Sequence, residues 1–236
     1  MIRLYIPEDL SSQALIEPSD SQTHYLLRVM RLKITDRVLV FNGRNGEWEA
    51  EIIHASKRSS MLRMDHQTRV QTQDPELHLL FPPLKPKRVE FLIEKGTELG
   101  VTHFHPIITG RTSSQKFNGE KSQIHALEAS EQCERLTIPH LLPLEKLESK
   151  LKNWDRNTTI IVGDETHMSP PLLSAKLTPK LAFMVGPEGG WTPDELATFK
   201  NLKGLKSVDL GPLILRSETA AIVGIATLGQ MRHTKS

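Results

Sequence analysis

The chain has 236 residues, of which 38% are hydrophobic and 25% charged, and its net charge at pH 7 is +2. These values describe an ordinary globular protein and exclude a strongly basic tail, so any nucleic-acid-binding surface has to arise from charges that cluster on folding. The lone Cys133 excludes an internal disulfide, and no apolar run reaches the length of a signal peptide or a membrane-spanning helix, so we expect a cytoplasmic protein.

Short strands separated by tight turns are predicted in residues 1–70. We expect these strands at 37–42, 47–53 and 58–65. The pairs Asn42-Gly43 and Asn45-Gly46 are turn signals between the first two strands. In the second strand, Trp48, Ala50 and Ile52 alternate with glutamates, which is typical of a half-buried strand. The pattern predicts a small β-barrel.

A helix is predicted between these strands and the N-terminus, at residues 23–33. Arg28 and Arg31 are three residues apart, so they share one face of such a helix. The face could bind phosphates, or it could be an ordinary solvated basic surface.

Strands and helices alternate beyond a polar linker at residues 70–76, which divides the chain into domains 1–70 and 71–236. We expect strands at 77–82, 103–108, 158–163, 181–185 and 208–210, and helices at 87–99, 119–135, 193–200 and 217–231. Such alternation predicts an α/β domain with a parallel sheet. His103 and His105 share one strand, but no cysteine or histidine set completes a metal site, so we expect no metal.

Two glycine-containing loops in the second domain each follow a buried-type strand and precede a helix. The first is Gly186-Pro187-Glu188-Gly189-Gly190, and the second runs from Leu210 to Thr219 with the sequence Leu-Gly-Pro-Leu-Ile-Leu-Arg-Ser-Glu-Thr. Glycines allow sharp turns and close approach of the backbone to a ligand, and ligands of open α/β sheets bind beyond the carboxyl ends of the strands. Either loop alone could be an ordinary strand-to-helix turn; together, with their carboxylates and an arginine, they favour a binding site.

These two loops resemble those of the SPOUT methyltransferases and, more narrowly, of the ribosomal RNA small subunit methyltransferase E family. Further matches along the chain include His24 to Arg31, Lys85 to Glu90 and Ala129 to Arg135. The resemblance implies methylation of N3 of one uridine of 16S ribosomal RNA with S-adenosylmethionine as cofactor. It also implies a PUA-like RNA-binding barrel, a trefoil-knotted methyltransferase domain, and a homodimer that acts on the small ribosomal subunit during ribosome biogenesis.

The resemblance, together with the chemistry of methyl transfer and the placement of charged residues, indicates roles for particular residues. The catalytic candidates are Arg216, as the cation that stabilises charge on the uracil, and Glu188 and Glu218, as bases or substrate orienters. The cofactor-binding candidates are Gly163, Gly186, Pro187, Gly189, Gly190, Leu210, Gly211, Leu213, Leu215 and Thr219. The RNA-binding candidates are Arg28, Arg31, Lys85, Lys87, Arg88, Arg111, Gln132 and Arg135. The family commonly has a basic residue where this chain has Leu213, so a substrate contact by that side chain is in doubt.

Alternative interpretations of several candidate residues, and of the chain as a whole, remain open. Glu218 could merely stabilise the dipole of its own helix, and Lys85, Lys87 and Arg88 could form a solvated loop. Gln132 and Arg135, one helical turn apart, could face a substrate or cap a neighbour. The whole chain could be a non-catalytic RNA-binding assembly factor, or a nucleotide-binding regulator, although neither glycine loop contains a lysine.

Overall fold

The computed structural model describes residues 1–233, and its contacts divide the chain into two units. The first unit consists of Met1–Gln73 together with Ser130–Ile138, and the second of residues 74–129 and those from 139 onward. The domains expected from the sequence, 1–70 and 71–236, differ from these units in two respects: the boundary lies after Gln73, and the segment 130–138 belongs to the first unit by its contacts.

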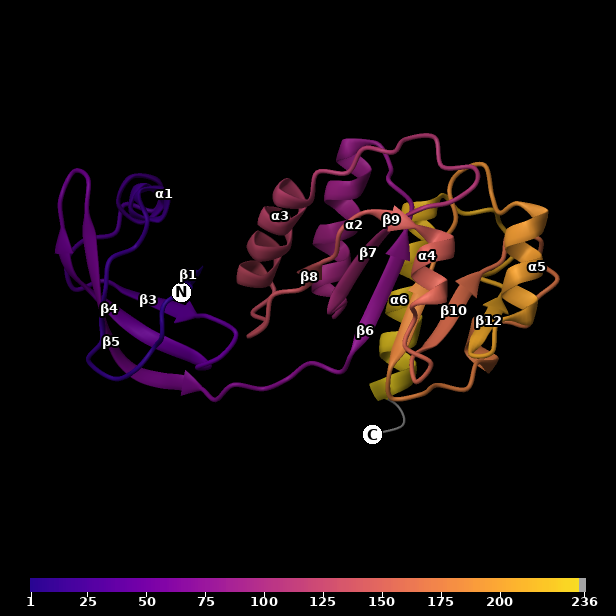
Figure 1. Cartoon of the computed structure of the whole chain (residues 1–236). Coiled ribbons are helices and arrows are strands. Elements are labelled where there is room, and N and C mark those ends of the chain that lie inside the picture. The colour runs from indigo at the N-terminus through magenta and orange to yellow at the C-terminus, as the bar shows by residue number, and fades with distance from the viewer. Residues whose placement is uncertain (234–236) are drawn as a thin grey trace. The chain divides into compact units, whose positions relative to one another are not determined.

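A mixed sheet surrounds the core of the first unit. Within residues 1–73 its strands are β1 (Arg3–Tyr5), β2 (Leu15–Ile16), β3 (Arg37–Phe41), β4 (Glu47–Ala55) and β5 (Ser60–Arg69), paired in the order β1-β3-β4-β5-β2 (Figure 1). The three predicted strands are confirmed as β3, β4 and β5. Ala50 and Ile52 are fully buried and Trp48 packs against the same core, as their alternation predicts.

The helix predicted at 23–33 is wrong in extent. Helix α1 (Asp20–His24) continues as a π-helical turn, η1 (Tyr25–Val29), which ends when Leu32 N–H donates to the Leu26 carbonyl at 3.0 Å. Arg31 then adopts a left-handed conformation with φ 58°. Arg28 and Arg31 are both exposed, but they do not share a helix face, because the helix has ended between them.

The segment Ser130–Ile138 is held on the first unit by hydrogen bonds from two arginines, of which Arg3 is buried. Arg3 donates to the carbonyls of Ser130, at 2.7 Å, and of Arg135, and its Nε donates to Glu47 at 2.6 Å. Arg69 donates to the same glutamate and to the Glu134 carbonyl. Glu47 is therefore buried as a charged residue that two arginines neutralise, which explains why the expected polar position on β4 faces inward.

A parallel sheet forms the second unit. Its strands within residues 74–233 are β6 (Leu77–Phe81), β7 (His103–Ile108), β8 (His140–Leu141), β9 (Glu145–Lys146), β10 (Thr159–Gly163), β11 (Leu181–Met184) and β12 (Leu205–Val208). They pair in the order β12-β10-β11-β6-β7-β8, and β9 pairs with the far end of β7 (Figure 1). The α/β class and the parallel sheet expected from the alternation are confirmed.

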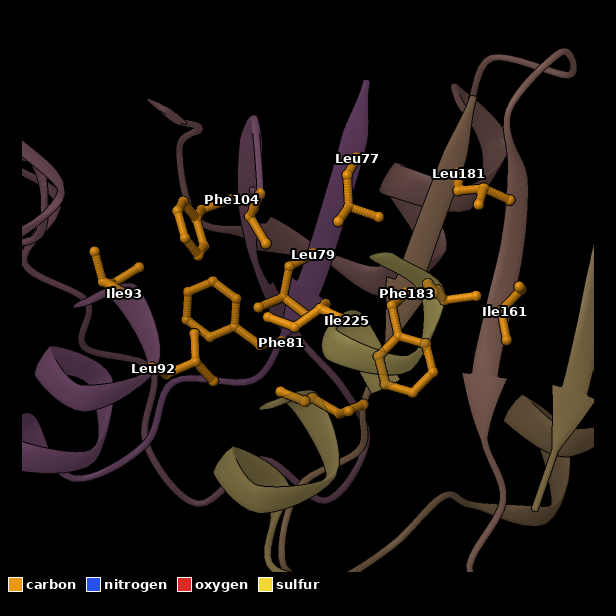
Figure 2. Close-up of a cluster of buried hydrophobic side chains, with 14 of the residues drawn as sticks. Leu77, Leu79, Phe81, Leu92, Ile93, Phe104, Ile161, Leu181, Phe183 and Ile225 are labelled. Atoms are coloured by element: carbon orange, nitrogen blue, oxygen red, sulfur yellow. The ribbon is translucent and has the colours of Figure 1, made fainter. Parts of the chain in front are cut away.

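Helices cover both faces of this sheet. They are α2 (Pro86–Glu98), α3 (Gly119–Gln132), α4 (Leu147–Lys152), α5 (Pro193–Asn201) and α6 (Ser217–His233), with a short 3₁₀ turn, η2 (Leu172–Ser174). One face packs Phe81, Phe104 and Phe183 against α2 and α6, as Figure 2 shows for Leu92 and Ile225. The opposite face buries apolar residues of α4 and α5. Burial on both faces explains the continuous apolar runs of the strands.

Local signals placed most of these elements correctly. Strand β7 has the expected bounds, Thr192 caps α5 with a capping box completed by Glu195, and Gly100 ends α2 with φ 88°. The strand predicted at 208–210 is wrong, because β12 runs over Leu205–Val208 and ends where the second glycine loop begins. The trefoil knot stays a prediction. None of the helices within residues 1–233 is both long and apolar enough to cross a bilayer.

Candidate cofactor pocket

A cleft of about 240 Å³ opens at the carboxyl ends of β10, β11 and β12. These three strands are neighbours in a parallel sheet, so the loops that follow them meet at one edge. The cofactor-binding candidates that line the cleft are Gly163, Gly186, Pro187, Gly190, Leu210, Gly211, Leu213 and Leu215. Of the other two, Gly189 packs against Arg111, and Thr219 is exposed in the first turn of α6.

Apolar residues and carboxylates share the lining of this pocket. Val185, Leu210, Leu215 and Ala220 provide the apolar surface. The acidic residues of the lining are Asp164, Glu165, Glu188 and Asp209, and the arginine of the lining is Arg216. A ligand that combines a flat apolar part with hydroxyl or cationic groups matches this lining.

Two of these carboxylates, those of Asp164 and Asp209, form hydrogen bonds that stabilise the loops. Asp164 accepts from Ser169 Oγ at 2.6 Å and from Thr166; burial alone would raise its pKa, but these hydrogen bonds outweigh burial and lower it. Asp209 contacts His167 Nδ1 at 3.0 Å and accepts from the Gly211 N–H at 3.2 Å, and both contacts lower its pKa. These acids build the walls of the pocket.

Glu165 is less committed than either aspartate. It accepts a long hydrogen bond, 3.4 Å, from the Trp191 N–H, and the side chain is exposed. Gly190 has φ 70°, a left-handed conformation that favours glycine, and a Cβ there would only push aside the flexible end of Glu165. Glu165 is not among the site residues expected from the sequence. The signal that could have indicated it is its place two residues after Gly163, at the end of a buried strand.

Arg88 joins both candidate bases. It lies in the first turn of α2, where its Nη1 is 3.0 Å from Glu188 Oε1 and its Nε is 3.4 Å from Glu218 Oε1. Lys85 and Lys87, grouped with Arg88 in the sequence, are exposed. The expected basic cluster is therefore divided: one member binds carboxylates of the pocket loops, and two face solvent.

The start of α6 contributes polar atoms that have no partner. Within residues 1–233, Ser217 Oγ and Glu218 Oε2 are buried without a hydrogen bond, and Ser217 lines the pocket. A buried hydroxyl without a partner costs free energy, which a ligand's polar group would recover. Arg216 is exposed at the pocket. Together these residues make the N-terminal end of α6 a polar side of the site.

The remaining RNA-binding candidates fall into the two units. In the second unit, Arg111 Nη1 donates to the Gly189 carbonyl at 2.9 Å, which attaches it to the first glycine loop. In the first, the helix predicted through Arg135 is too long, because α3 ends at Gln132 and Glu134 has φ 61°. Gln132 and Arg135 therefore do not lie one turn apart on a helix.

Histidines gather toward the amino ends of the strands, opposite the pocket. His78 Nδ1 is 2.8 Å from His105 Nε2, and the ring centroids of His78 and His103 are 4.4 Å apart and stacked. Glu76 Oε1 is 2.7 Å from His78 Nε2. A carboxylate only accepts, so His78 donates from Nε2 to Glu76. Burial lowers the pKa of both His78 and His105, which favours neutral rings with His105 Nε2 donating to His78 Nδ1. We call His78, His103, His105 and His140 the histidine stack.

Comparison with known proteins gives a consistent result over both units. Residues 72–229 match the family model of an RNA methyltransferase domain, and residues 18–61 match that of an RNA methyltransferase PUA domain. Ribosomal RNA small subunit methyltransferase E of Rickettsia conorii is 34% identical over 95% of this chain and 93% of its own. The enzyme of the same name from Synechocystis is 30% identical over 97% of this chain and 77% of its own.

A solved structure agrees over nearly the full length. Ribosomal RNA small subunit methyltransferase E from Neisseria gonorrhoeae, bound to S-adenosyl methionine, superposes with a TM-score of 0.87 at 27% identity, and covers 98% of this chain and 97% of the other. The agreement spans the α/β unit and the N-terminal unit alike.

Proposed function

Because the chain belongs to the ribosomal RNA small subunit methyltransferase E family, we propose that it transfers a methyl group from S-adenosylmethionine to N3 of one uridine of 16S ribosomal RNA in the small ribosomal subunit. The observation that carries this proposal is the meeting of both glycine loops at one pocket: Gly186 to Gly190 and Leu210 to Arg216 are about twenty residues apart in sequence and line the same cleft. A ribosomal substrate also implies that the enzyme works in the cytoplasm.

The lining of the pocket fits this cofactor. Val185, Leu210 and Leu215 offer an apolar surface for adenine, and the loop backbone offers hydrogen-bonding groups for its edge. Glu165 suits the ribose hydroxyls or the ammonium group, and Ser217 Oγ, buried and without a partner in residues 1–233, is available to a polar group of the ligand.

Methyl transfer from this cofactor requires only a few contributions from the side chains of the protein. Bound S-adenosylmethionine supplies a methyl group on a sulfonium, which is already a good electrophile. The residues of the chain have to align the uracil, remove the N3 proton and stabilise the negative charge that spreads over N3 and the carbonyl oxygens. Arg216, exposed at the pocket, is our choice for the cation.

Glu188 is our choice for the base. It lines the pocket, and 44% of its side chain is exposed, so a substrate can reach it. Glu218 has 11% of its side chain exposed and is ion-paired in the first turn of α6. In this proposal Glu218 supports the site, and Glu188 exchanges the proton.

RNA is held by cations outside the pocket. We assign this role to Arg28 and Arg31 in the first unit and to Lys85 and Lys87 in the second, all of which are exposed. Phosphate contacts of this kind position an RNA without reading its sequence.

A homodimer through α6 is part of the proposal. Among the small and apolar residues of that helix, Ala221, Gly224 and Leu228 pack inside the unit. The half-buried residues left for a partner are Ala220, Val223, Ala226 and Thr227. Sedimentation at micromolar concentration should give twice the chain mass; a monomer would contradict this part.

The proposal is tested by methyl transfer itself. Small ribosomal subunits from cells that lack this enzyme are incubated with the full chain and labelled S-adenosylmethionine, and the RNA is digested to nucleosides for mass analysis. The expected product is one N3-methyluridine per subunit. Binding of S-adenosylmethionine and of RNA without any transfer would support the non-catalytic assembly factor instead.

A further inference from the structure

Arg88 contacts two glutamates that are far from it in the sequence. Its guanidinium contacts Glu188 in the first glycine loop and Glu218 in α6, which are 100 and 130 residues away along the chain. Both glutamates lie in the second unit with Arg88 itself. One side chain thus ties α2, the loop after β11 and the start of α6 together.

The contacts of the Arg88 guanidinium are better suited to orienting a carboxylate than to neutralising its charge alone. A guanidinium presents its donors in a rigid planar fork, and here Nη1 and Nε serve two different carboxylates at 3.0 and 3.4 Å. Glu218 is nine-tenths buried in a helix, so it is a fixed anchor for that fork. Glu188 lies between Pro187 and Gly189 in a loop, and the same fork restricts where its carboxylate can lie.

The alternative role, binding of RNA phosphates, fits Arg88 less well than its neighbours. Its side chain is 26% exposed and already occupied by two carboxylates, whereas Lys85 and Lys87 are exposed. A phosphate would have to displace an ion pair at Arg88 but only water at the lysines. The phosphate role therefore belongs to the lysines.

We propose that Arg88 is a positioning residue for methyl transfer, which holds the Glu188 carboxylate at the pocket while Glu218 anchors the guanidinium. This inference rests on the proposed function. Arg88 acts through Glu188 and does not touch the reacting atoms. Removing it should therefore slow the transfer step and leave the cofactor and RNA bound as before.

The test compares two cations of one helix in the full-length protein. Arg88→Met removes the bridge. Lys95→Met is the matched control, because Lys95 also lies on α2 and pairs with two glutamates, Glu94 at 2.7 Å and Glu98 at 2.9 Å, outside the pocket. Single-turnover methyl transfer, RNA affinity, calorimetric binding of S-adenosylmethionine and thermal unfolding are measured for each variant.

We expect Arg88→Met to lower the single-turnover rate by roughly a hundredfold, the order of loss that follows from misplacing a catalytic group by about an ångström. Cofactor and RNA affinity should stay near those of the wild type. Arg88→Lys should give an intermediate rate, because it keeps the charge without the fork. Added methylguanidinium should restore part of the rate of Arg88→Ala, which a loss of folding would not allow. Lys95→Met should transfer methyl groups normally.

A double-mutant cycle tests the route through Glu188. If Arg88 acts by holding that carboxylate, Arg88→Met should cost little further rate in a Glu188→Gln background. Full additivity would overturn the proposal, as would a normal rate with weaker RNA binding, which assigns Arg88 to phosphate. If the wild type itself transfers no methyl group, the proposed function fails. If the wild type is active but Arg88→Met and Lys95→Met transfer methyl groups at the same rate, the inference about Arg88 fails and the proposed function stands.

Discussion

The two ends of the parallel sheet differ in how their ionisable side chains are surrounded. At the carboxyl end, Glu188 and Glu218 lie in ion-pair contact with Arg88, and the pocket opens to solvent. At the amino end, the histidine stack is packed together with Trp154, which contacts His78 and His105 edge-on. The first arrangement leaves charges available for chemistry, and the second removes charge from the interior.

Burial determines the behaviour of the histidine stack. Burial, with the neighbouring His78 and His140, lowers the pKa of His103 to about 4, and burial with the nearby Lys150 lowers that of His105 to about 2. The pKa of His78 is lowered too, again by burial, although Glu76 opposes the shift. Titratable side chains in a cluster therefore do not by themselves mark a functional site; their access to solvent and ligand decides.

The largest effect should come from the pocket end. We expect Arg216→Ala to reduce the single-turnover rate about 10²- to 10³-fold, because a fixed cation stabilises charge that develops in the transition state. Cofactor affinity by calorimetry and the unfolding temperature should change little, since Arg216 is exposed. A variant with normal turnover and weaker RNA binding would assign Arg216 to RNA positioning.

The amino end should respond to pH. Folded-state pKa values below the ordinary 6.5 mean that the unfolded chain binds more protons, so stability is full above pH 6.5 and falls as the pH is lowered toward 4. Allowing for partial exposure, we expect a loss of about 1–2 kcal/mol for each neutral histidine by pH 5. Urea unfolding at pH 7 and pH 5 measures it.

A pair of variants sharpens this pH test. His103→Gln removes one member of the histidine stack and should flatten the pH dependence. The matched control His66→Gln, at a side chain that is 60% exposed, should leave the dependence unchanged. If both variants keep the full pH dependence, the acid sensitivity arises elsewhere in the chain.

A smaller effect is expected from Glu165 at the pocket. Glu165→Gln should weaken binding of S-adenosylmethionine by roughly tenfold, the worth of a charge-assisted hydrogen bond at an exposed site. Calorimetry at constant pH measures the affinity. Glu128→Gln, an equally conservative change at a glutamate with 64% exposure on α3, is the control and should bind the cofactor normally. Equal affinities in the two variants would remove Glu165 from the cofactor site.

The smallest effects should lie away from both ends of the sheet. Arg28→Gln and Arg31→Gln should each weaken RNA binding a few-fold and reduce the salt slope by about one, because one counterion fewer is released. Turnover at saturating RNA should persist. An unchanged slope in both variants would show that these exposed arginines contact no phosphate.

Local chemistry in the sequence predicted much of this protein. The bounds of β7, the Thr192 cap and the two glycine loops depend on neighbours within a few residues, so periodicity and turn chemistry predict them. The sequence also predicted that the two glycine loops, which follow β11 and β12, would contribute to one site, since ligands of open α/β sheets bind beyond the carboxyl ends of the strands. Gly163, at the end of β10, was a candidate only through the family resemblance.

Tertiary structure alone decided which side chains pair across the chain. Arg88 in α2 reaches Glu188 and Glu218, and Arg3 captures the carbonyl of Ser130, over separations of 100 to 130 residues. The histidine stack likewise forms because β6, β7 and β8 are adjacent. Hydrophobic periodicity cannot predict such contacts, because it indicates only which face of a helix or strand is buried. Which residue packs against that face depends on how distant elements pack together.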